Sequence, residues 1–471
     1  MFSVASILPN SQQKNETDSY ISRFFKENKL GTLLNKANIK KEDGISPLLL
    51  FQFIFSLVLH GKNLYRTLDS NRIQDAPKKD TVYRLLNNPT YNWRKFLTLL
   101  SKNVIVTKLL HLVSNDRERV LIFDDSLYSR ARSKAVELLS LVHDHTTGQF
   151  IKGFRMLTLG RSDGNTFIPL AFSLLSSAKK KNRFQEINSD IDKRTVGYKR
   201  RKEALKKSTE AMFDLLDEVN PLQLCTKTLL FDSWFAFPKV IKRVVSEYPL
   251  HVICMLKSMH RVYYTYQGEE YTLNQLYKKV RKKRGRAKIL ASIVVSLGPD
   301  DKGKDIQARI VFVRDRNRSK NWLALLSTNI ELPDEEVVRL YGKRWDIECF
   351  FKVTKSHLRL AKEFQSRSYD AMVAHTTIVL ARYIMLALSS REEEDPKTIG
   401  QLFYLCCDEM EDIRFAQALI LVLDLLKSTL SNEPILSEEK VQSIVDELFN
   451  NLPQFLKKAF LSNDEIKANA A

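Results

Sequence analysis

Four residues between positions 341 and 355 combine an aromatic hydroxyl, two cations and a carboxylate. They are Tyr341, Arg344, Glu348 and Lys355. Because an α-helix turns by about 100° per residue, these side chains would project along one stripe of a single helix. The adjoining arc is apolar and includes Ile347. We therefore predict one helix that carries a charged seam beside the face that enters the core.

Two short apolar runs supply further carboxylates. Residues 120–123 end at the pair Asp124 and Asp125, and residues 228–231 end at Asp232. Each run predicts a short buried β-strand whose last residue leaves the sheet edge with a carboxylate. A single aspartate after a strand is more often a loop cap. Two such strands followed by the charged helix favour a shared catalytic site.

Three converging carboxylates have a specific chemical use. Hard oxygen ligands suit Mg²⁺ or Mn²⁺, which retain several waters and bind substrate phosphates. Two such ions, about 3.5–4 Å apart, activate an attacking water or 3′-hydroxyl and stabilise the leaving oxygen in an in-line displacement at phosphorus. The sequence shows no Gly-rich phosphate loop, no defensible Ser-His-Asp spacing and no Cys/His zinc pattern that would compete with this interpretation.

The spacing of the helix residues resembles a known signature. Two, three and six residues separate Tyr341, Arg344, Glu348 and Lys355 in turn. This pattern resembles the Y-(2)-R-(3)-E-(6)-K signature of DDE transposases of the insertion sequence 4 family. The segment Asp232-Ser-Trp-Phe also resembles the D-x-x-F motif of that family.

This resemblance spans roughly residues 119–360 and implies a fold and a site. The fold is mixed α/β, with an RNase H-like catalytic domain that contains a β-rich insertion and has helical regions on either side. Asp125, Asp232 and Glu348 would be the catalytic residues and would hold two Mg²⁺ or Mn²⁺ ions. The other signature residues are Tyr341, Arg344 and Lys355. They would contact DNA phosphates or order the third acid, Glu348.

The choice of Asp125 over Asp124 rests on the family pattern. Strand alternation points the two side chains to opposite faces, so only one of them can reach the shared site. By position in the family pattern, Asp125 is the expected ligand. Asp124 would then need a salt bridge or a hydrogen bond on the other face.

Composition agrees with a nucleic-acid partner. Lys and Arg number 75 against 55 Asp and Glu, so the formal charge is +20, which attracts polyanions. Charge alone also fits a membrane-surface or ribosomal protein, whereas 44% hydrophobic residues exclude a mostly disordered chain. The five scattered cysteines predict reduced, buried thiols. Apolar runs at 47–59 and 376–388 are too short to span a bilayer. We expect a cytoplasmic, nucleoid-associated bacterial protein without membrane segments.

The chain divides into three expected regions. Residues 1–115 predict a helical N-terminal domain that either binds DNA or supports the next domain. Residues 116–366 form the expected catalytic domain, with the β-rich insertion at about 250–328. Residues 367–471 predict a helical C-terminal region that either contacts a second subunit or packs on the catalytic sheet.

The insertion contains the densest basic segment. Eight of the eleven residues in 278–288 are basic, and none is acidic. Such density predicts contacts with the DNA backbone. The candidates within it are Lys282, Lys283, Arg284 and Arg286. Trp322 is a further candidate, for stacking on an unpaired base, although core packing is the more common role of a single tryptophan.

The predicted function is that of an insertion-sequence transposase. Such an enzyme binds double-stranded DNA, at the terminal inverted repeats of its element and at the target, and cuts and joins strands by cut-and-paste. Synapsis of two ends predicts a homodimer. The alternatives are a metal-dependent nuclease without strand transfer and a domesticated DNA-binding protein, although the intact acids argue against the latter.

Overall fold

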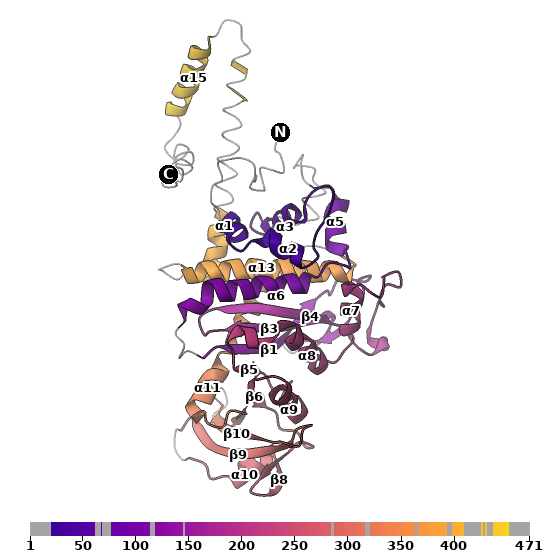
Figure 1. Ribbon diagram of the computed structural model, residues 1–471, viewed down its shortest axis with the longest axis vertical. Coiled ribbons are helices and arrows are strands. Elements are labelled where there is room, and N and C mark those ends of the chain that lie inside the picture. Colours follow the sequence, from indigo (N-terminus) through magenta and orange to yellow (C-terminus); the bar gives the residue numbers. More distant parts are fainter. Residues whose placement is uncertain are drawn as a thin grey trace.

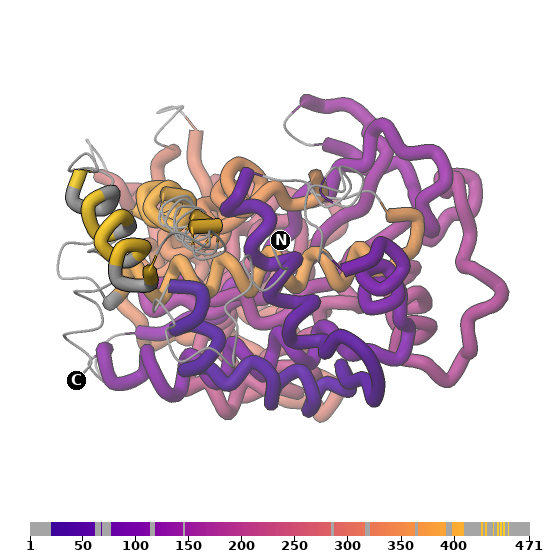
Figure 2. The backbone as a smooth tube through the Cα atoms, turned by 90° about the horizontal axis from the view of Figure 1, so that it is seen from above, coloured from indigo at the N-terminus to yellow at the C-terminus, as the bar shows by residue number. Residues whose placement is uncertain are grey.

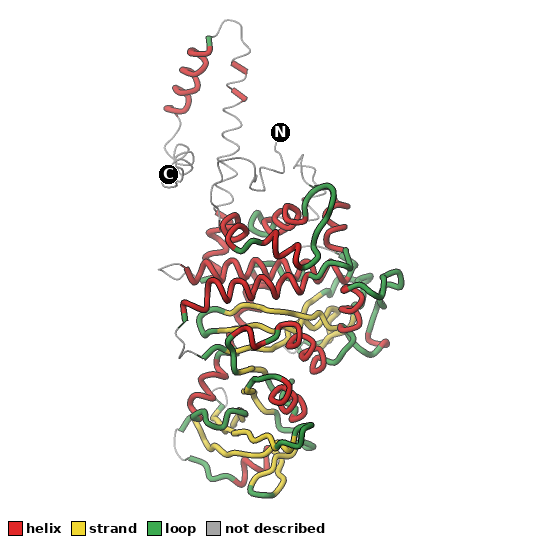
Figure 3. The backbone as a smooth tube through the Cα atoms, viewed as in Figure 1, coloured by secondary structure: helices red, strands yellow, loops and turns green. Residues whose placement is uncertain are grey.

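The computed structural model describes residues 20–61, 67, 77–113, 118–144, 147–283, 287–315, 321–362, 366–392, 398–408, 425–426, 429–430 and 437–451. A mixed sheet lies at the centre, with a layer of helices above it and a strand-rich lobe below it in the orientation of Figure 1. Figure 3 separates the same layers by type of secondary structure. The predicted mixed α/β class is confirmed.

The first part of the sheet has six strands. They are β1 (Val120–Ser129), β2 (Ser140–His143), β3 (Phe150–Ser162), β4 (Phe167–Leu175), β5 (Thr228–Phe231) and β6 (His251–Leu256). β1, β3 and β4 form an antiparallel meander, and β5 and β6 run parallel to β1. The spatial order β4-β3-β1-β5-β6 agrees with the RNase H-like core expected from the sequence.

Burial explains why these segments form strands. All nine residues of β4 and all four of β5 are buried, as expected for strands covered on both faces. In the turn between β3 and β4, Asp163 Oδ1 accepts hydrogen bonds from the N–H groups of Asn165 and Thr166, both at 2.9 Å. Gly160 allows close packing, because a Cβ there would lie 2.1 Å from the ring of Phe167.

The strands of the insertion extend this same sheet. They are β7 (Tyr263–Tyr266), β8 (Glu269–Thr272), β9 (Ile289–Pro299), β10 (Asp305–Arg314) and β11 (Trp322–Ser327). β11 pairs antiparallel with β6, and the order continues as β11-β10-β9-β7-β8. Strands therefore lie where the sequence predicts a β-rich insertion, while β6, inside the expected limits, is also a strand of the parallel core.

A helical layer covers one face of the sheet. Its N-terminal helices are α1 (Tyr20–Glu27), α2 (Leu30–Lys36), α3 (Pro47–Ser56), α5 (Lys79–Asn87) and α6 (Trp93–Val104). Four of them, α1, α3, α5 and α6, contact α13 (Tyr369–Glu392). In Figure 1, α1, α2 and α3 lie above α13 and α6 lies below it, next to β4; Figure 2 shows the indigo N-terminal helices from above. The N-terminal helices and α13 thus share one hydrophobic core with the sheet.

Helix α13 is much longer than the apolar run 376–388 suggests. Its stretch Tyr369–Arg391 is long and apolar enough to cross a membrane, but it is buried within the protein. Arg382 in this helix donates to the carbonyl of Phe55 at 2.8 Å and to that of Ile54. These carbonyls lie at the C-terminal end of α3, where a cation is favourable. The helix is therefore a central core element.

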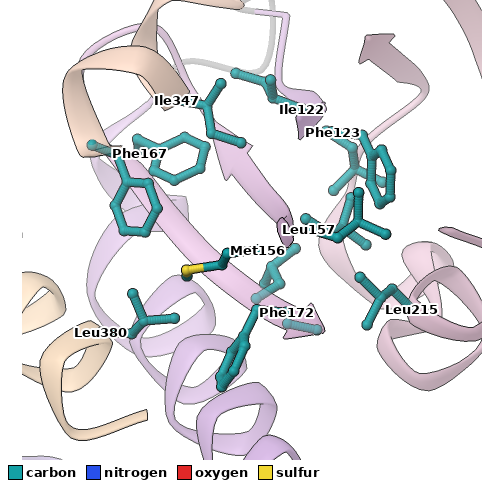
Figure 4. Packing of buried hydrophobic residues seen from close by; sticks show 14 of the residues in the cluster. Ile122, Phe123, Met156, Leu157, Phe167, Phe172, Leu215, Ile347 and Leu380 are labelled. Atoms are coloured by element: carbon teal, nitrogen blue, oxygen red, sulfur yellow. The ribbon is translucent and has the colours of Figure 1, made fainter. Parts of the chain in front are cut away.

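The remaining helices are α7 (Val196–Glu203), α8 (Ser208–Val219), α9 (Pro238–Glu247), α10 (Leu273–Lys279), α11 (Asp334–Gly342), α12 (Trp345–Ser356) and α15 (Glu438–Asn451). They include elements that flank the sheet, whereas α15 lies away from it, at the upper left of Figure 1. Figure 4 shows Leu215 of α8 on the side of Phe123 and Leu157, and Leu380 of α13 on the side of Met156 and Phe172.

The cysteines only partly follow the expectation of buried thiols. All five are free thiols, as expected. Cys254 and Cys406 are buried, but Cys225 and Cys349 are exposed and Cys407 is intermediate. Cys225 and Cys349 are exposed although their sequence neighbours are mostly apolar, because Cys225 lies in a turn and Cys349 lies on the outer side of α12.

Candidate active site

The charged seam is carried by two helices and not by the one helix that the sequence predicts. Tyr341 belongs to the last turn of α11, and Glu348 and Lys355 belong to α12. Between them, the N–H groups of Lys343 and Arg344 bond carbonyls three residues back, each at 3.0 Å. This tighter turn breaks the regular helix but keeps the chain winding in the same sense.

Strand register brings two of the acids together. β1 and β5 are parallel, and Phe123 lies opposite Phe231. The next residues along the two strands are Asp124 and Asp232, which therefore leave the same edge on neighbouring strands and on the same face. Asp232 is held there by a hydrogen bond that its Oδ1 accepts from the N–H of Trp234, at 2.8 Å.

Arg344 connects the strand to the helix. Its Nη1 lies 2.8 Å from Asp124 Oδ2, and its Nη2 donates to Glu348 Oε1. The guanidinium also lies against the ring of Tyr341, 5.8 Å from the ring centroid. One cation thus bridges an acid from β1 and an acid from α12, and Asp232 stands beside them.

The crowding of acids is visible in the pKa of Asp124. Burial, with the like charges of Asp232 and Asp125, raises this pKa to about 7 against the opposing effect of Arg344. Burial also raises the pKa of the Tyr341 hydroxyl, which is close enough to Asp232 to feel its charge. A site of this kind favours the binding of an additional cation.

Asp125 does not lie with the other acids, and its expected orientation is wrong. Its two carboxylate oxygens accept hydrogen bonds from Arg155 Nη1 at 2.8 and 3.0 Å, on the opposite face of β1. The physical reason is the pairing of Phe123 with Phe231, which assigns the face of Asp232 to Asp124. The salt bridge expected for the aspartate facing away from the site is therefore made by Asp125.

Lys355 continues the seam along β1. Its Nζ donates to Ser126 Oγ, two residues after Asp124 and on the same face of the strand. Burial lowers the pKa of this ammonium group, while the nearby carboxylate of Asp144 opposes the shift. At the other end of α12, Asp346 accepts a hydrogen bond from Ser162 and anchors the first turn on β3.

The other DNA-binding candidates lie elsewhere. Trp322 stacks on Tyr277 at 4.3 Å between ring centroids and contacts Phe312 edge-on at 5.4 Å, so it packs within the insertion. Lys282 lies over the same tyrosine, 4.8 Å from its ring centroid. The backbone N–H of Lys283 donates a hydrogen bond to the carbonyl of Leu290.

Of the four charged candidates in this segment, Arg284 and Arg286 lie outside the described residues. Sequence reasoning passed over Arg155 and Ser162, because neither belongs to a recognisable motif. Their roles depend on strand pairing between β1 and β3 and on the docking of α12.

The donor set fits a hard divalent ion in type but not yet in position. Asp124, Asp232 and Glu348 offer carboxylate oxygens, which Mg²⁺ and Mn²⁺ prefer. Within the described part of the chain, no three acidic, histidine or cysteine side chains lie close enough to hold one ion. Arg344 occupies the space between two of the acids, so its guanidinium must move before an ion can bind there.

Asp124 lies within β1, just past its pairing with β5, Asp232 follows the end of β5, and Glu348 comes from α12. The chain belongs to the DDE superfamily endonuclease family, whose model matches residues 68–320. This match includes Asp124 and Asp232 and ends before Glu348.

The fold can also be superposed on that of piggyBac transposase, solved in a synaptic complex with hairpin DNA. The identity is 13%, the alignment covers 96% of this chain and 81% of that chain, and the TM-score is 0.42. No curated protein matches the chain.

Proposed function

We propose that this DDE endonuclease is a DNA transposase that cuts the ends of its element and joins them to target DNA by a divalent-metal-dependent reaction. The observation that carries the proposal is the bridge made by Arg344 between Asp124 and Glu348, with Asp232 on the adjacent strand. We assign Asp124, not Asp125, as the first metal ligand. The finer assignment to the insertion sequence 4 family rests on the spacing from Tyr341 to Lys355.

The chemistry follows from the residues around the acids. Bound Mg²⁺ or Mn²⁺ would activate the attacking oxygen and neutralise charge on the scissile phosphate and the leaving oxygen. Asp124, Asp232 and Glu348 would hold the ions. Arg344, once released from the acids, would place a fixed positive charge beside the phosphate, and Lys355 would supply a second cation along β1.

The partner in this proposal is double-stranded DNA, at the inverted repeats of the element and at the target. Two ends must be held together for joining, so we propose a homodimer in the synaptic complex. The net charge of +20 supports the DNA partner. A nuclease without strand transfer is the second candidate, and a joining assay separates the two.

The first prediction concerns the acids. Glu348→Gln and Asp124→Asn each remove a charged ligand while preserving volume. We expect both to lower the cleavage rate by more than about a hundredfold, because a bound ion lowers the activation barrier by several kcal/mol. Binding to end DNA should persist. Asp125→Asn should retain cleavage within about tenfold, because its partner is Arg155.

The assay contains Mg²⁺ or Mn²⁺, DNA carrying the repeats that flank the gene, and a target plasmid. Cleavage without joining by the wild-type protein would select the nuclease candidate. Full activity of Asp124→Asn together with an inactive Asp125→Asn would return the first ligand to Asp125. Activity of Glu348→Gln in Mg²⁺ would remove Glu348 from the site.

A further inference from the structure

A basic cleft opens beside the acids, at the end of β1. Its volume is about 1000 Å³, and its walls come from residues 127–136 on one side and from 355, 360–362, 366 and 367 on the other. Six cations line it, and none of the lining residues that the structure describes is acidic. These cations are Arg130, Arg132, Lys134, Lys355, Lys362 and Arg367. We refer to this feature as the β1 cleft.

The β1 cleft is continuous with the proposed catalytic site. Lys355 belongs to its lining and bonds Ser126, which follows Asp124 by two residues on the same face of β1. A strand rises about 3.3 Å per residue, so the cleft begins roughly 7 Å from Asp124. That length corresponds to about two nucleotides of one strand in duplex DNA, at about 3.4 Å each.

One of the six cations has a structural task. Arg130 Nη1 donates to the carbonyl of Ala361 at 3.3 Å, and its Nη2 donates to that of Ser366 at 3.0 Å. The guanidinium therefore ties the wall formed by β1 to the wall formed after α12. This contact fixes the width of the cleft and explains why Arg130 is only partly exposed.

Four other cations have no such task. Arg132, Lys134, Lys362 and Arg367 are all exposed, and none of them forms an ion pair with any residue that the structure describes. Like charges that face one another across a concave surface repel each other and focus the field into the cleft. A polyanion would relieve that repulsion.

The lining also indicates which part of a nucleic acid would enter. Among the lining residues that the structure describes, the one aromatic residue, Tyr128, is buried, so it offers no exposed ring for base stacking. The polar groups that dominate these described walls are cations, which bind phosphate oxygens. The chemistry of the cleft suits phosphates.

We propose that the β1 cleft holds the phosphate backbone of the DNA strand that enters the acid site, starting about two nucleotides from the phosphate to be cut. The inference rests on the proposed endonuclease reaction for the position of the cut, but its binding test does not. The contacts are independent of sequence, because they reach only phosphates.

The test compares three double variants, each losing two positive charges. Arg132→Gln with Lys134→Gln changes one wall, and Lys362→Gln with Arg367→Gln changes the other. The control is Lys227→Gln with Lys304→Gln. Lys227 precedes β5, at the opposite end of that strand from Asp232, and Lys304 lies in the turn between β9 and β10; both are exposed.

The readout is the salt dependence of DNA binding, measured by fluorescence anisotropy without divalent metal on a duplex with a single-stranded overhang. Each lost phosphate contact lowers the log-log slope by about 0.7 on a single strand and about 0.9 on a duplex. We expect a reduction of roughly 1.4–1.8 for either wall variant and an unchanged slope for the control. Wild-type slopes in both wall variants, with circular dichroism showing native folding, would overturn the proposal.

A second arm locates the contact. Single methylphosphonates, which remove the charge of one phosphate, are placed along the strand, and the wild-type cut in Mn²⁺ defines the origin. We expect weaker binding when the neutral position lies about two to four nucleotides from the cut on one side, and no such effect in the wall variants. Sensitivity on both sides, or at distant positions only, would contradict the placement. If the wild-type protein does not cut, the proposed reaction fails while the salt slopes still decide the role of the cleft.

Discussion

Arg344 already pairs with two of the acids as their counter-charge. It bonds Asp124 and Glu348 at once, and it is partly shielded from water, so it neutralises carboxylates that would otherwise repel each other. In the proposed reaction, a divalent ion that uses both acids would replace this guanidinium. Metal binding would then be an exchange of cations, and the affinity for the ion would report the difference between the two.

This exchange gives a prediction for Arg344→Gln. Without the resident guanidinium, we expect the metal-free acids to bind Mn²⁺ about tenfold more tightly, a gain of about 1.4 kcal/mol. That gain is well within the roughly 4 kcal/mol that two unit charges 4 Å apart exchange at an effective dielectric constant of about 20. Free Mn²⁺ is measured by electron paramagnetic resonance in the absence of DNA.

The matched control is Arg155→Gln, which removes a guanidinium from Asp125 on the other face of β1. Its Mn²⁺ affinity should stay close to that of the wild-type protein. Weaker Mn²⁺ binding by Arg344→Gln would show that the guanidinium organises the acids for the ion and does not compete with it.

Sequence reasoning reached single residues where short motifs define them. Asp232 ends an apolar run, and Glu348 lies at fixed distances from its neighbours. The structure pairs Glu348 with Arg344 and brings Asp232 close to Asp124. The choice between Asp124 and Asp125 was out of reach, because alternation shows only that the two diverge. The face that each occupies depends on the register between β1 and β5, which is a contact across more than a hundred residues.

At the scale of elements, α13 is where a buried titratable group affects stability. His375 lies in this helix and is almost wholly buried. Burial lowers its pKa well below the ordinary value, and the nearby charges of Arg382 and Arg130 lower it further. The folded protein therefore resists protonation of this imidazole at a pH where the unfolded chain accepts a proton.

The predicted consequence is a loss of stability in acid. Above about pH 6.5 neither state binds the proton, so the full stability is present; as the pH falls below that value, the unfolded state gains protons and the free energy of unfolding drops. One group contributes up to about 1.4 kcal/mol per pH unit. We expect His375→Gln to show a shallower slope between pH 6.5 and 5 in urea unfolding.

The exposed His251 provides the control, and His251→Gln should keep the wild-type slope. Equal slopes for the wild-type protein and His375→Gln would mean that the imidazole also takes up a proton in the folded state. Substitution of a core residue will lower the stability at every pH, so the comparison uses the slope alone.

Elements were predictable where the pattern was local. The strand at 228–231 follows from its buried apolar run, and the turn between β3 and β4 follows from its Asp and Gly. The run at 120–123 correctly indicates a strand, but β1 does not end at the acids: it continues to Ser129 through its pairing with β3. The break between α11 and α12 did not show, because the helical stripe from Tyr341 to Lys355 is compatible with a straight helix. At the break, Lys343 bonds the carbonyl of Glu118 and Arg344 pairs with the acids. These are tertiary contacts, which a local sequence pattern does not reveal.

At the scale of the whole molecule, one sheet joins the proposed catalytic core to the insertion. The pairing of β6 with β11 makes the insertion strands neighbours of the strands that carry the acids. The described ends of the basic segment 278–288 lie in the last turn of α10 and just before β9. Its role in DNA binding remains a prediction.

The test neutralises Lys282, Lys283, Arg284 and Arg286 together. If they contact the backbone, binding to specific and unrelated duplexes should weaken by a similar factor. The salt dependence should flatten by up to about 0.9 units of log-log slope per lost contact. Loss confined to one sequence would instead indicate base reading, worth roughly 1–3 kcal/mol per position.

An unchanged slope would identify the segment as a solvated surface, and the charge of +20 would have to act elsewhere. The two wall variants of the β1 cleft then become the comparison of choice, because they lie on the other side of the acids along the same sheet. The two basic surfaces should contribute additively if they bind different stretches of one DNA molecule.

The sequence indicated the classes of element but not how the layers share a core. A helical beginning, a mixed middle with extra strands and a helical later part are all visible in the hydrophobic periodicity. The insertion of α13 between the N-terminal helices and the sheet is not, since it depends on contacts such as that of Arg382 with Phe55, more than three hundred residues apart.

The order of the acids along the chain sets the interval between the synthesis of the first acid and that of the last. Asp124 and Glu348 are more than two hundred residues apart. At about 5–20 residues per second, a ribosome needs roughly 10–45 s to pass from one to the other. Throughout that interval the nascent chain contains Asp124 but not yet Glu348 of α12. Arg344 is made four residues before Glu348, so the cation that pairs with the third acid is already in the chain when that acid is added.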